Sequence, residues 1–379
     1  MTRQKIVLTI QEFSYGGASK QVFWLMQYLC QQGFEVVLIS NAKDTWLGSQ
    51  LRAHALPVKA YYSSWIQRAF NPLKEIGVIF FIVYVLCKEK PHNVLLGGAK
   101  LLVQGGIAAW LCQVPGRFIH LHGLGAPSKS LMLSLSQFGY QQLAKMGFQF
   151  VTVSQYDYQF LSTQSGISSE QIYLNRNGID IDTVRTGDRT VLRKQYNIPS
   201  DAFVIGMVGR FGRHKRYDWF LQMLNQLCPK NAHVYGLLIG EGPDRDKLQR
   251  QINQSGYRDR VFVTGFIENV ADIYAALDLS VLLTDFEGLS NVLCESIAAG
   301  LPVITNPVCG NPEVVIHGEN GYLVKTPDEA VVYAQKLIDD PRLCLELGLR
   351  GKQIATDQFN ATTQIKQMVD KVLTGKAFK

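Results

Sequence analysis

The sequence lacks the cysteine patterns that hold small or metal-dependent folds together. Its seven cysteines are odd in number and widely spaced, and none stands in a CxxC pair. This usage argues against a disulfide framework or a zinc site and indicates reduced thiols in a cytosolic protein. Low-complexity tracts and internal repeats are also missing. With 47% hydrophobic and 18% charged residues over 379 positions, the composition is that of a globular chain long enough for two domains.

Long apolar runs are missing as well. The most apolar stretch, Ile76–Cys87, is about 12 residues long and ends at Lys88, so it is too short to span a bilayer. We expect a core helix there, with a membrane-facing helix as the alternative. The start of the chain, Met1–Ile10, passes directly into a strand pattern without the design of a signal peptide, which favours a cytoplasmic protein.

The net charge of +7 is unevenly distributed. Residues 1–180 hold 15 Lys and Arg against 8 Asp and Glu, whereas the remainder holds 23 of each. The cations are scattered rather than gathered in an arm or stripe, which disfavours nucleic acid as a partner. A basic half suits a phosphate-bearing acceptor or peripheral contact with an anionic membrane, here the inner face of the cytoplasmic membrane. A surface made basic for solubility is the other interpretation.

Short β-branched runs alternate with longer helical patterns in both halves. The predicted strands of the first half are Lys5–Ile10, Glu35–Ser40, Asn93–Leu96, Arg117–His120 and Phe150–Ser154. Those of the second half are Ala202–Val208, Val234–Ile239, Val261–Thr264, Leu279–Leu283 and Pro302–Thr305. Such alternation predicts the α/β class, with two Rossmann-like doubly wound domains. Ligands of these domains bind beyond the carboxyl ends of the strands, so the loops there are the candidates for a site.

Two of these loops suit an anion. The first predicted strand runs into a loop whose Gly16 and Gly17 precede an amphipathic pattern at Ser19–Gln32; helix-start amides bind anions, although a plain tight turn is the other interpretation. The second loop, Gly209–Arg216, holds four basic residues besides His214. Cations at the carboxyl end of a strand can clamp a diphosphate, and a solvated basic loop is the alternative.

Two glutamates follow the strand Leu279–Leu283. Glu287 lies in the loop and Glu295 comes eight residues later, about two turns into the next helix and on roughly the same side. One carboxylate can reach a ligand from the loop while the other supports it from the helix, and the amides of residues 288–291 can face phosphate. A surface position for Glu295 is the alternative.

With this pair, the sequence resembles the retaining GT-B glycosyltransferases of family 4 type (glycosyl transferases group 1), whose mark is two glutamates separated by seven residues. Other motifs in family order are Gly16-Gly17-Ala18, His122-Gly123, Asn177–Asp180, Gly209-Arg210 with Lys215, Gly240–Pro243 and Asn320-Gly321. The resemblance covers nearly the whole chain, most strongly from about 200 to 325. It implies two domains facing across a cleft, with acceptor binding in 1–185, nucleotide-sugar binding in 186–355, and a C-terminal helix in 356–379 that packs back on the first domain.

The resemblance also implies roles for individual residues. Arg210 and Lys215 grip the donor diphosphate, Glu287 holds the transferred sugar, and His122 contacts that sugar from the first domain. Glu295 binds the ribose hydroxyls. The other implied donor-binding residues are Gly16, Gly17, Gly240, Glu241, Gly242, Pro243, Phe266, Ile267, Gly288, Leu289, Ser290 and Asn291. No metal and no cofactor is implied, because arginine and lysine take the place of a metal and no DxD motif stands in a suitable loop.

Two positions depart from the family pattern. Cys309–Glu313 stands where paired glycines often precede a glutamate, which puts a phosphate contact there in question, and Arg216 replaces a usual glycine and faces either phosphate or solvent.

The expected function is the transfer, with retention, of a sugar from a UDP- or GDP-linked donor to a saccharide or lipid-linked saccharide acceptor, in cell-surface polysaccharide or glycolipid assembly. We expect the domains to close on the donor and front-face attack to operate rather than double displacement through Glu287. The alternatives are a sugar-nucleotide epimerase or phosphorylase on the same scaffold and a non-catalytic nucleotide-sugar-binding subunit.

Overall fold

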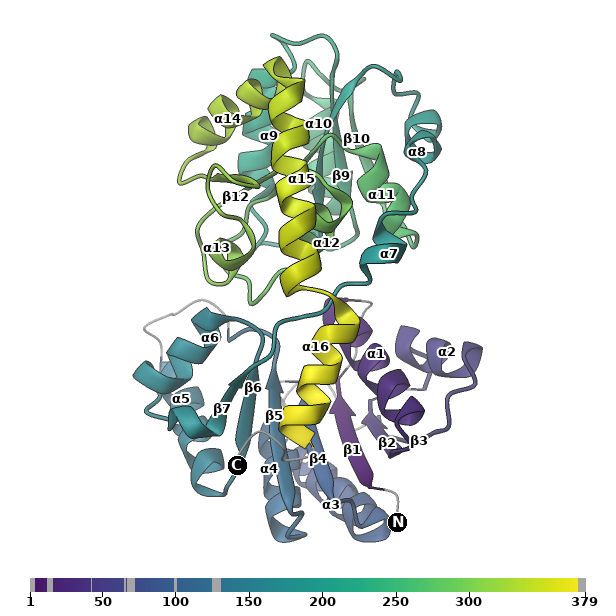
Figure 1. Ribbon diagram of the computed structural model, residues 1–379, viewed down its shortest axis with the longest axis vertical. Coiled ribbons are helices and arrows are strands. Elements are labelled where there is room, and N and C mark those ends of the chain that lie inside the picture. Colours follow the sequence, from purple (N-terminus) through teal and green to yellow (C-terminus); the bar gives the residue numbers. More distant parts are fainter. Residues whose placement is uncertain are drawn as a thin grey trace. The chain divides into compact units, whose positions relative to one another are not determined.

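The computed structural model describes residues 4–11, 16–41, 43–64, 66, 72–98, 101–124 and 131–373. The chain forms two compact units. The first contains Met1–Gly178 and Thr362–Lys379, and the second contains Ile179–Ala361. Each unit is built on one parallel sheet with helical connections (Figure 1). The predicted α/β class and the two doubly wound domains are therefore confirmed.

The sheet of the first unit has the strand order β3-β2-β1-β4-β5-β6-β7, with every pair parallel. The strands are β1 (Lys5–Ile10), β2 (Glu35–Ser40), β3 (Val58–Tyr62), β4 (Asn93–Gly97), β5 (Gly116–Leu121), β6 (Gln149–Thr152) and β7 (Ile172–Leu174). The helices are α1 (Gly17–Gln31), α2 (Trp46–Ala53), α3 (Pro72–Glu89), α4 (Leu101–Leu111), α5 (Leu131–Lys145) and α6 (Gln155–Gln159), and α16 (Ala361–Met368) follows from the far end of the chain. The order reverses between β1 and β4, which makes this the topological switch point.

The second unit repeats this arrangement, with the order β10-β9-β8-β11-β12-β13. Its strands are β8 (Phe203–Val208), β9 (Val234–Ile239), β10 (Val261–Gly265), β11 (Leu279–Leu282), β12 (Val303–Thr305) and β13 (Gly321–Leu323). Its helices are α7 (Ile181–Val184), α8 (Arg189–Gln195), α9 (Tyr217–Leu227), α10 (Arg245–Asn253), α11 (Val270–Ala276), α12 (Asn291–Ala299), α13 (Asn311–Val314), α14 (Pro327–Asp339) and α15 (Pro341–Gln358). The order reverses between β8 and β11.

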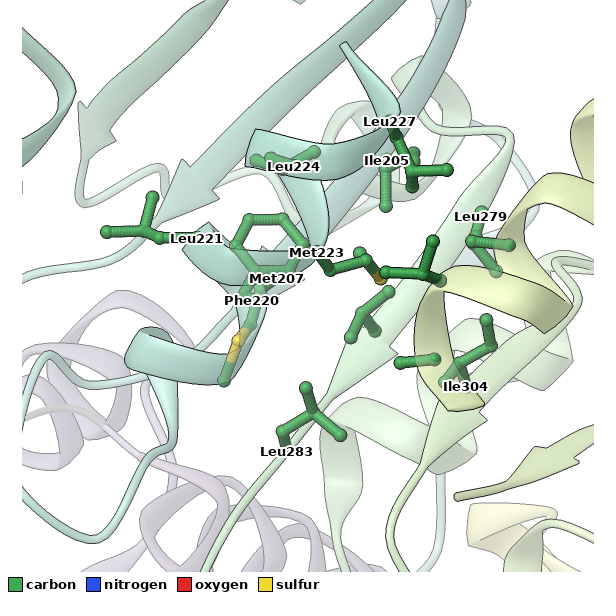
Figure 2. Close-up of a cluster of buried hydrophobic side chains, with 14 of the residues drawn as sticks. Ile205, Met207, Phe220, Leu221, Met223, Leu224, Leu227, Leu279, Leu283 and Ile304 are labelled. Atoms are coloured by element: carbon green, nitrogen blue, oxygen red, sulfur yellow. The ribbon is translucent and has the colours of Figure 1, made fainter. Parts of the chain in front are cut away.

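The core of the second unit shows why these strands form. In Figure 2, Phe220 and Leu224 of α9 lie beside Ile205 and Met207 of β8, and all four are fully buried. Strands covered on both faces need continuous apolar runs rather than alternation, and residues 203–208 supply one. The buried sheet fixes where the loops at its carboxyl edge begin.

Two glycines, Gly240 and Gly242, allow the loops after β8, β9 and β10 to pack directly on one another. Gly240 has φ +145° and its nitrogen donates to the Gly265 carbonyl at 3.0 Å, while a Cβ on Gly240 would lie 2.0 Å from the Gly209 oxygen. Gly242 has φ +159°, and a Cβ there would lie 2.2 Å from the Phe211 oxygen. Any side chain at either position would push the loops apart, so glycine is required by both space and conformation.

In the first unit, a cluster of charged side chains lies at the amino-terminal edge of the sheet. Glu89, at the end of α3, has a side chain only 3% exposed and pairs with Lys5 at 3.0 Å and Lys59 at 2.5 Å, while Tyr61 donates to it at 2.5 Å. Burial opposes ionisation of Glu89, but the hydrogen bonds from Lys59, Tyr61 and Lys5 outweigh it and lower its pKa to about 2. Glu35 shares Lys5 at 2.8 Å but is 49% exposed.

Substitution of Gly240 by alanine tests the loop packing. We expect Gly240→Ala to lower the free energy of unfolding by about 3 kcal/mol, because it adds backbone strain and overpacking together. Gly212→Ala in the same loop region is the matched control: its Cβ would meet only the His214 ring at 3.7 Å, and we expect a change below about 1 kcal/mol. Urea unfolding measures both, and equal effects of the two variants would contradict the packing described.

Substitution of Glu89 tests the charge cluster. Glu89→Gln should cost about 3 kcal/mol in urea unfolding, since it leaves two cations without a buried partner, whereas Glu35→Gln should cost below about 1 kcal/mol because that pair is solvated. The folded pKa of Glu89 is depressed, so its contribution is present at neutral pH. It should fade as the pH falls from the ordinary carboxyl range through about 2. A wild-type stability that is flat over this interval would argue against it.

Candidate functional site

The candidate site lies at the carboxyl edge of the second sheet, at its switch point. β8 and β11 are neighbours, with Leu279 paired to Ile205 and Ser280 to Gly206. The basic loop, residues 209–216, leaves β8 there, and the glutamate segment begins after β11. Since doubly wound sheets bind ligands at this point, both predicted segments stand where chemistry is expected.

Backbone hydrogen bonds clasp the two loops to each other. Lys215 and Thr284 form an antiparallel bridge. The Arg216 nitrogen donates to the Leu283 carbonyl at 2.9 Å, and the Asp285 nitrogen donates to the His214 carbonyl at 2.8 Å. This loop clasp fixes the direction in which Lys215 leaves the backbone.

Buried polar side chains support the loop clasp through hydrogen bonds. The Thr284 hydroxyl donates to the His214 carbonyl at 2.9 Å. Asn306, after β12, accepts from the Thr284 nitrogen at 3.0 Å and donates to the Thr284 carbonyl at 2.7 Å. Thr284 is fully buried and Asn306 nearly so, so these bonds form out of competition with water and stiffen the loop.

The clasp brings Lys215 and Glu287 into an ion pair. The Lys215 ammonium contacts Oε2 of Glu287, with the lysine side chain 8% exposed and the glutamate 27% exposed. Two of the four side chains predicted to share a site are therefore in direct contact. A nearly buried cation beside a partly exposed carboxylate is suited to exchange that partner for an anionic ligand.

An aromatic pair borders this ion pair. The rings of His214 and Phe286 are stacked, with centroids 5.2 Å apart and planes inclined by 27°. Burial, and next the charge of Lys215, lower the pKa of His214 below its ordinary value. His214 is accordingly neutral at pH 7 and adds no charge to the cationic loop.

Glu295 is buried inside the same edge of the unit. It lies in α12, whose N-cap Ser290 accepts from the Leu293 nitrogen, and its Oε2 accepts a hydrogen bond of 2.7 Å from the Tyr274 hydroxyl. Burial, reinforced by Glu295, raises the pKa of Tyr274 well above its ordinary value, so Tyr274 is a proton donor at every physiological pH. Glu295 is 6% exposed, and the surface alternative for it is wrong.

The remaining predicted cations differ in their surroundings. Arg210 is exposed at the start of the basic loop. Arg216 pairs with Asp218 at 2.8 Å and with Asp285 at 3.5 Å, and its guanidinium lies 4.6 Å from the Trp219 ring centroid. Two carboxylates and a ring thus occupy Arg216, which disfavours the phosphate-facing alternative for this residue.

The other predicted donor-binding residues of this unit stand at the same edge. Gly240, Glu241, Gly242 and Pro243 follow β9, and Phe266 and Ile267 follow β10. Phe266 is 53% exposed, and Glu241 pairs with Arg245 at 3.5 Å. Gly288, Leu289 and Ser290 are buried and lead into α12, which begins at Asn291. At the departure from the family pattern, Cys309 has φ +46° just before α13.

The predicted site residues of the first unit are Gly16, Gly17 and His122. Gly16 caps α1 and Gly17 begins it, whereas residues 12–15 of the same loop lie outside the described residues. His122 follows β5 with its ring 4.1 Å from that of His120. Burial lowers the pKa of His122 to about 4, and burial with the neighbouring His122 lowers that of His120. Both imidazoles are neutral at pH 7.

A metal centre has no counterpart in the part of the chain that the structure describes. There, no three His, Cys, Asp or Glu side chains are grouped so as to hold an ion. The sequence did not predict Tyr274, Thr284 and Asn306. Tyr274 lies in an apolar helical stretch without a pattern of its own, but Thr284 and Asn306 are polar residues directly after predicted strands and could have been noted.

The chain is similar in sequence to known proteins. The family model described as "Glycosyl transferases group 1" matches residues 188–354. N-acetyl-alpha-D-glucosaminyl L-malate synthase from Bacillus anthracis is 31% identical over 182 residues, about half the length of each chain (48%). The capsular polysaccharide biosynthesis glycosyltransferase CapM from Staphylococcus aureus is 25% identical over 352 residues, 89% of each chain.

A solved structure extends the likeness to both units. HepE from Anabaena, in complex with UDP and glucose, has a TM-score of 0.83 and 23% identity, covering 98% of this chain and 100% of its own. At that identity the match shows the fold alone. These comparisons lead to one conclusion: the chain has the GT-B fold, and its residues 188–354 are similar to the glycosyl transferases group 1 family.

Proposed function

We propose that the protein is a retaining glycosyltransferase that uses a nucleoside diphosphate sugar as donor. The observation that carries the proposal is the Lys215–Glu287 ion pair at the β8/β11 switch point. It places a cation for phosphate and a carboxylate for sugar hydroxyls side by side. The match of residues 188–354 to the glycosyl transferases group 1 family supports glycosyl transfer as the reaction class.

The diphosphate would bind over the basic loop. Arg210 and Lys215 supply positive charge, and α12 begins at the same edge of the sheet, directly after Gly288–Ser290, so its amino-terminal end would face the diphosphate. As the bond to the sugar breaks, negative charge grows on the departing phosphate, so these groups stabilise the transition state more than the bound donor. Arginine and lysine do this without a metal ion in the proposed reaction.

Glu295 and Glu287 would hold the two sugars of the donor. The Tyr274 hydroxyl fixes Oε2 of Glu295, which orients that carboxylate to accept from the ribose hydroxyls. When phosphate takes over Lys215, Glu287 gains room to accept from hydroxyls of the transferred sugar. Because Glu287 is paired with Lys215, we assign it to holding the sugar rather than to nucleophilic attack.

The transfer would retain the anomeric configuration through front-face attack. The bond between the anomeric carbon and the β-phosphate oxygen breaks, and the acceptor hydroxyl oxygen bonds to the same face of that carbon. The acceptor proton passes to the departing phosphate, so atoms and charge balance without another reactant. His122, neutral at pH 7, is proposed to contact the donor sugar through hydrogen bonds rather than through charge.

We further propose a uridine diphosphate sugar as donor and a saccharide or lipid-linked saccharide as acceptor, in surface polysaccharide or glycolipid assembly. UDP is present in the HepE structure, and CapM is named for capsular polysaccharide biosynthesis. A panel of UDP, GDP and ADP in thermal unfolding tests the donor, since a ligand at a hundred times its Kd stabilises by about 2.7 kcal/mol. Stabilisation by none of the three would remove the basis of the proposal.

Substitution of two neighbouring cations, Lys215 and Arg216, tests whether Lys215 binds the donor phosphate or is part of a loop that is merely basic. Lys215→Ala should lower the turnover rate of donor by about 10²- to 10³-fold, as loss of one transition-state donor does. Arg216→Ala is the control, because its charge is already taken by Asp218 and Asp285, and its rate should stay within about threefold of wild type. Release of nucleotide from radiolabelled donor measures both. An unimpaired Lys215→Ala enzyme would refute the role.

Metal removal and product stereochemistry test the reaction type. Incubation with EDTA should leave turnover unchanged, because side-chain cations serve the diphosphate. The anomeric proton coupling of the product in NMR should match that of the donor. Inversion would contradict front-face transfer, and a changed sugar on the nucleotide without any acceptor would instead indicate an epimerase.

A further inference from the structure

The outward side of α3 in the first unit is apolar. Its most exposed side chains before residue 87 are Leu73 (81%), Ile76 (52%), Phe80 (69%) and Tyr84 (56%). At 3.6 residues per turn they fall within an arc of about 80° on the helix surface. The opposite side, with Val78, Ile82, Val85 and Leu86, is buried in the core. The predicted core helix is thus confirmed for its inner side only, and a helix apolar on all sides is one that something covers.

α4 continues this surface. α3 and α4 pack side by side (Figure 1). Val103, Trp110 and Leu111 of α4 are each about half exposed, and residues 101–113 contain no charged residue. We call the exposed side chains of both helices the α3/α4 face: Leu73, Ile76, Phe80, Tyr84, Val103, Trp110 and Leu111. Exposed apolar side chains on two packed helices enlarge the apolar surface of this unit, and soluble proteins rarely leave a large apolar surface without a partner.

The exposed charged side chains along α3 and directly after it are cations. α3 has two carboxylates, and neither points into the patch: Glu89 is buried against Lys5 and Lys59, and Glu75 is half-buried and accepts from Gln104 at 2.5 Å. The cations Lys88 and Lys90 are exposed at the end of α3. Cations beside an apolar patch complement a surface that is negative outside and apolar inside.

The type of exposed side chain changes from apolar to amphipathic along α3. Leucine, isoleucine and phenylalanine come first, and then Tyr84, whose hydroxyl accepts from the Lys88 ammonium at 3.2 Å, with that ammonium 5.4 Å from the Tyr84 ring centroid. Tyrosine, tryptophan and lysine prefer the level of lipid headgroups, where one end of the side chain is apolar and the other wet. In the described residues no helix is long and apolar enough to cross a bilayer, so contact would be with its surface.

We propose that the α3/α4 face docks the protein on an anionic phospholipid surface. Leu73, Ile76 and Phe80 enter the acyl boundary, Tyr84 and Trp110 lie at headgroup level, and Lys88 contacts lipid phosphate. A second copy of this chain fits less well, because a twofold contact would bring the Lys88 side chains of both copies to the same patch without a carboxylate to pair them. The proposal does not depend on the transfer reaction.

Vesicle sedimentation tests the docking. Wild-type protein should co-sediment with vesicles of equal parts phosphatidylglycerol and phosphatidylcholine, more weakly with phosphatidylcholine alone, and more weakly at high salt. Ile76→Gln/Phe80→Gln should lower the partition coefficient at least about tenfold, because two inserted side chains are lost. Lys88→Gln should lower it by about fivefold on the anionic vesicles only.

The matched control lies in the second unit. Val332→Gln/Leu345→Gln removes two side chains that are equally exposed, at 65% and 66%, and should leave vesicle binding unchanged. Wild-type protein that stays in the supernatant, or a control that loses binding as strongly, would overturn the proposal. So would a wild-type dimer in light scattering that Ile76→Gln/Phe80→Gln turns into a monomer. Nucleoside diphosphate binding, measured on the same variants, should be unaffected, so a failure here is distinct from a failure of the proposed donor site.

Discussion

The loop clasp between residues 214–216 and 283–285 is the constraint on which the candidate site depends. Neither loop has regular structure that would fix a side chain by itself. Their mutual backbone bonds, supported by Thr284 and Asn306, make one rigid edge from two loops that are about 70 residues apart in sequence. The Lys215–Glu287 pair follows from that edge, because the clasp brings both backbones into reach before any side chain interacts.

The surrounding unit is built to keep that edge rigid. The glycines at 240 and 242 let the loop after β9 lie directly on the backbone of the loop after β8, and the apolar core of β8, α9 and β11 anchors the strands beneath. Preorganisation of this kind matters for phosphate chemistry, where the protein contributes position and charge rather than covalent steps. The ion pair with Glu287 orients the Lys215 ammonium in a site where an isolated buried cation would be costly.

Much of the fold and of the candidate site could be predicted from the sequence, and physical reasons explain why the rest could not. Short continuous apolar runs such as Phe203–Val208 predicted central strands, because a strand that is buried on both faces is apolar along its whole length. The edge strands β3, β7 and β13 were not predicted, since they are short and β3 is partly exposed, so their patterns are weak. Lys215, Glu287 and Glu295 were found through motif spacing. Tyr274, Thr284 and Asn306 were not predicted, because their roles come from contacts with residues distant in sequence. The sequence also did not identify which side of α3 is exposed, because hydropathy alone does not tell which face of an apolar helix packs inward.

A crystal structure of the protein with UDP bound is the most direct measurement of the central claim. The account predicts diphosphate oxygens within hydrogen-bond distance of the Lys215 ammonium, with the ribose hydroxyls on Glu295 and Glu287 released from its lysine. UDP bound elsewhere, with the Lys215–Glu287 pair unchanged, would contradict it.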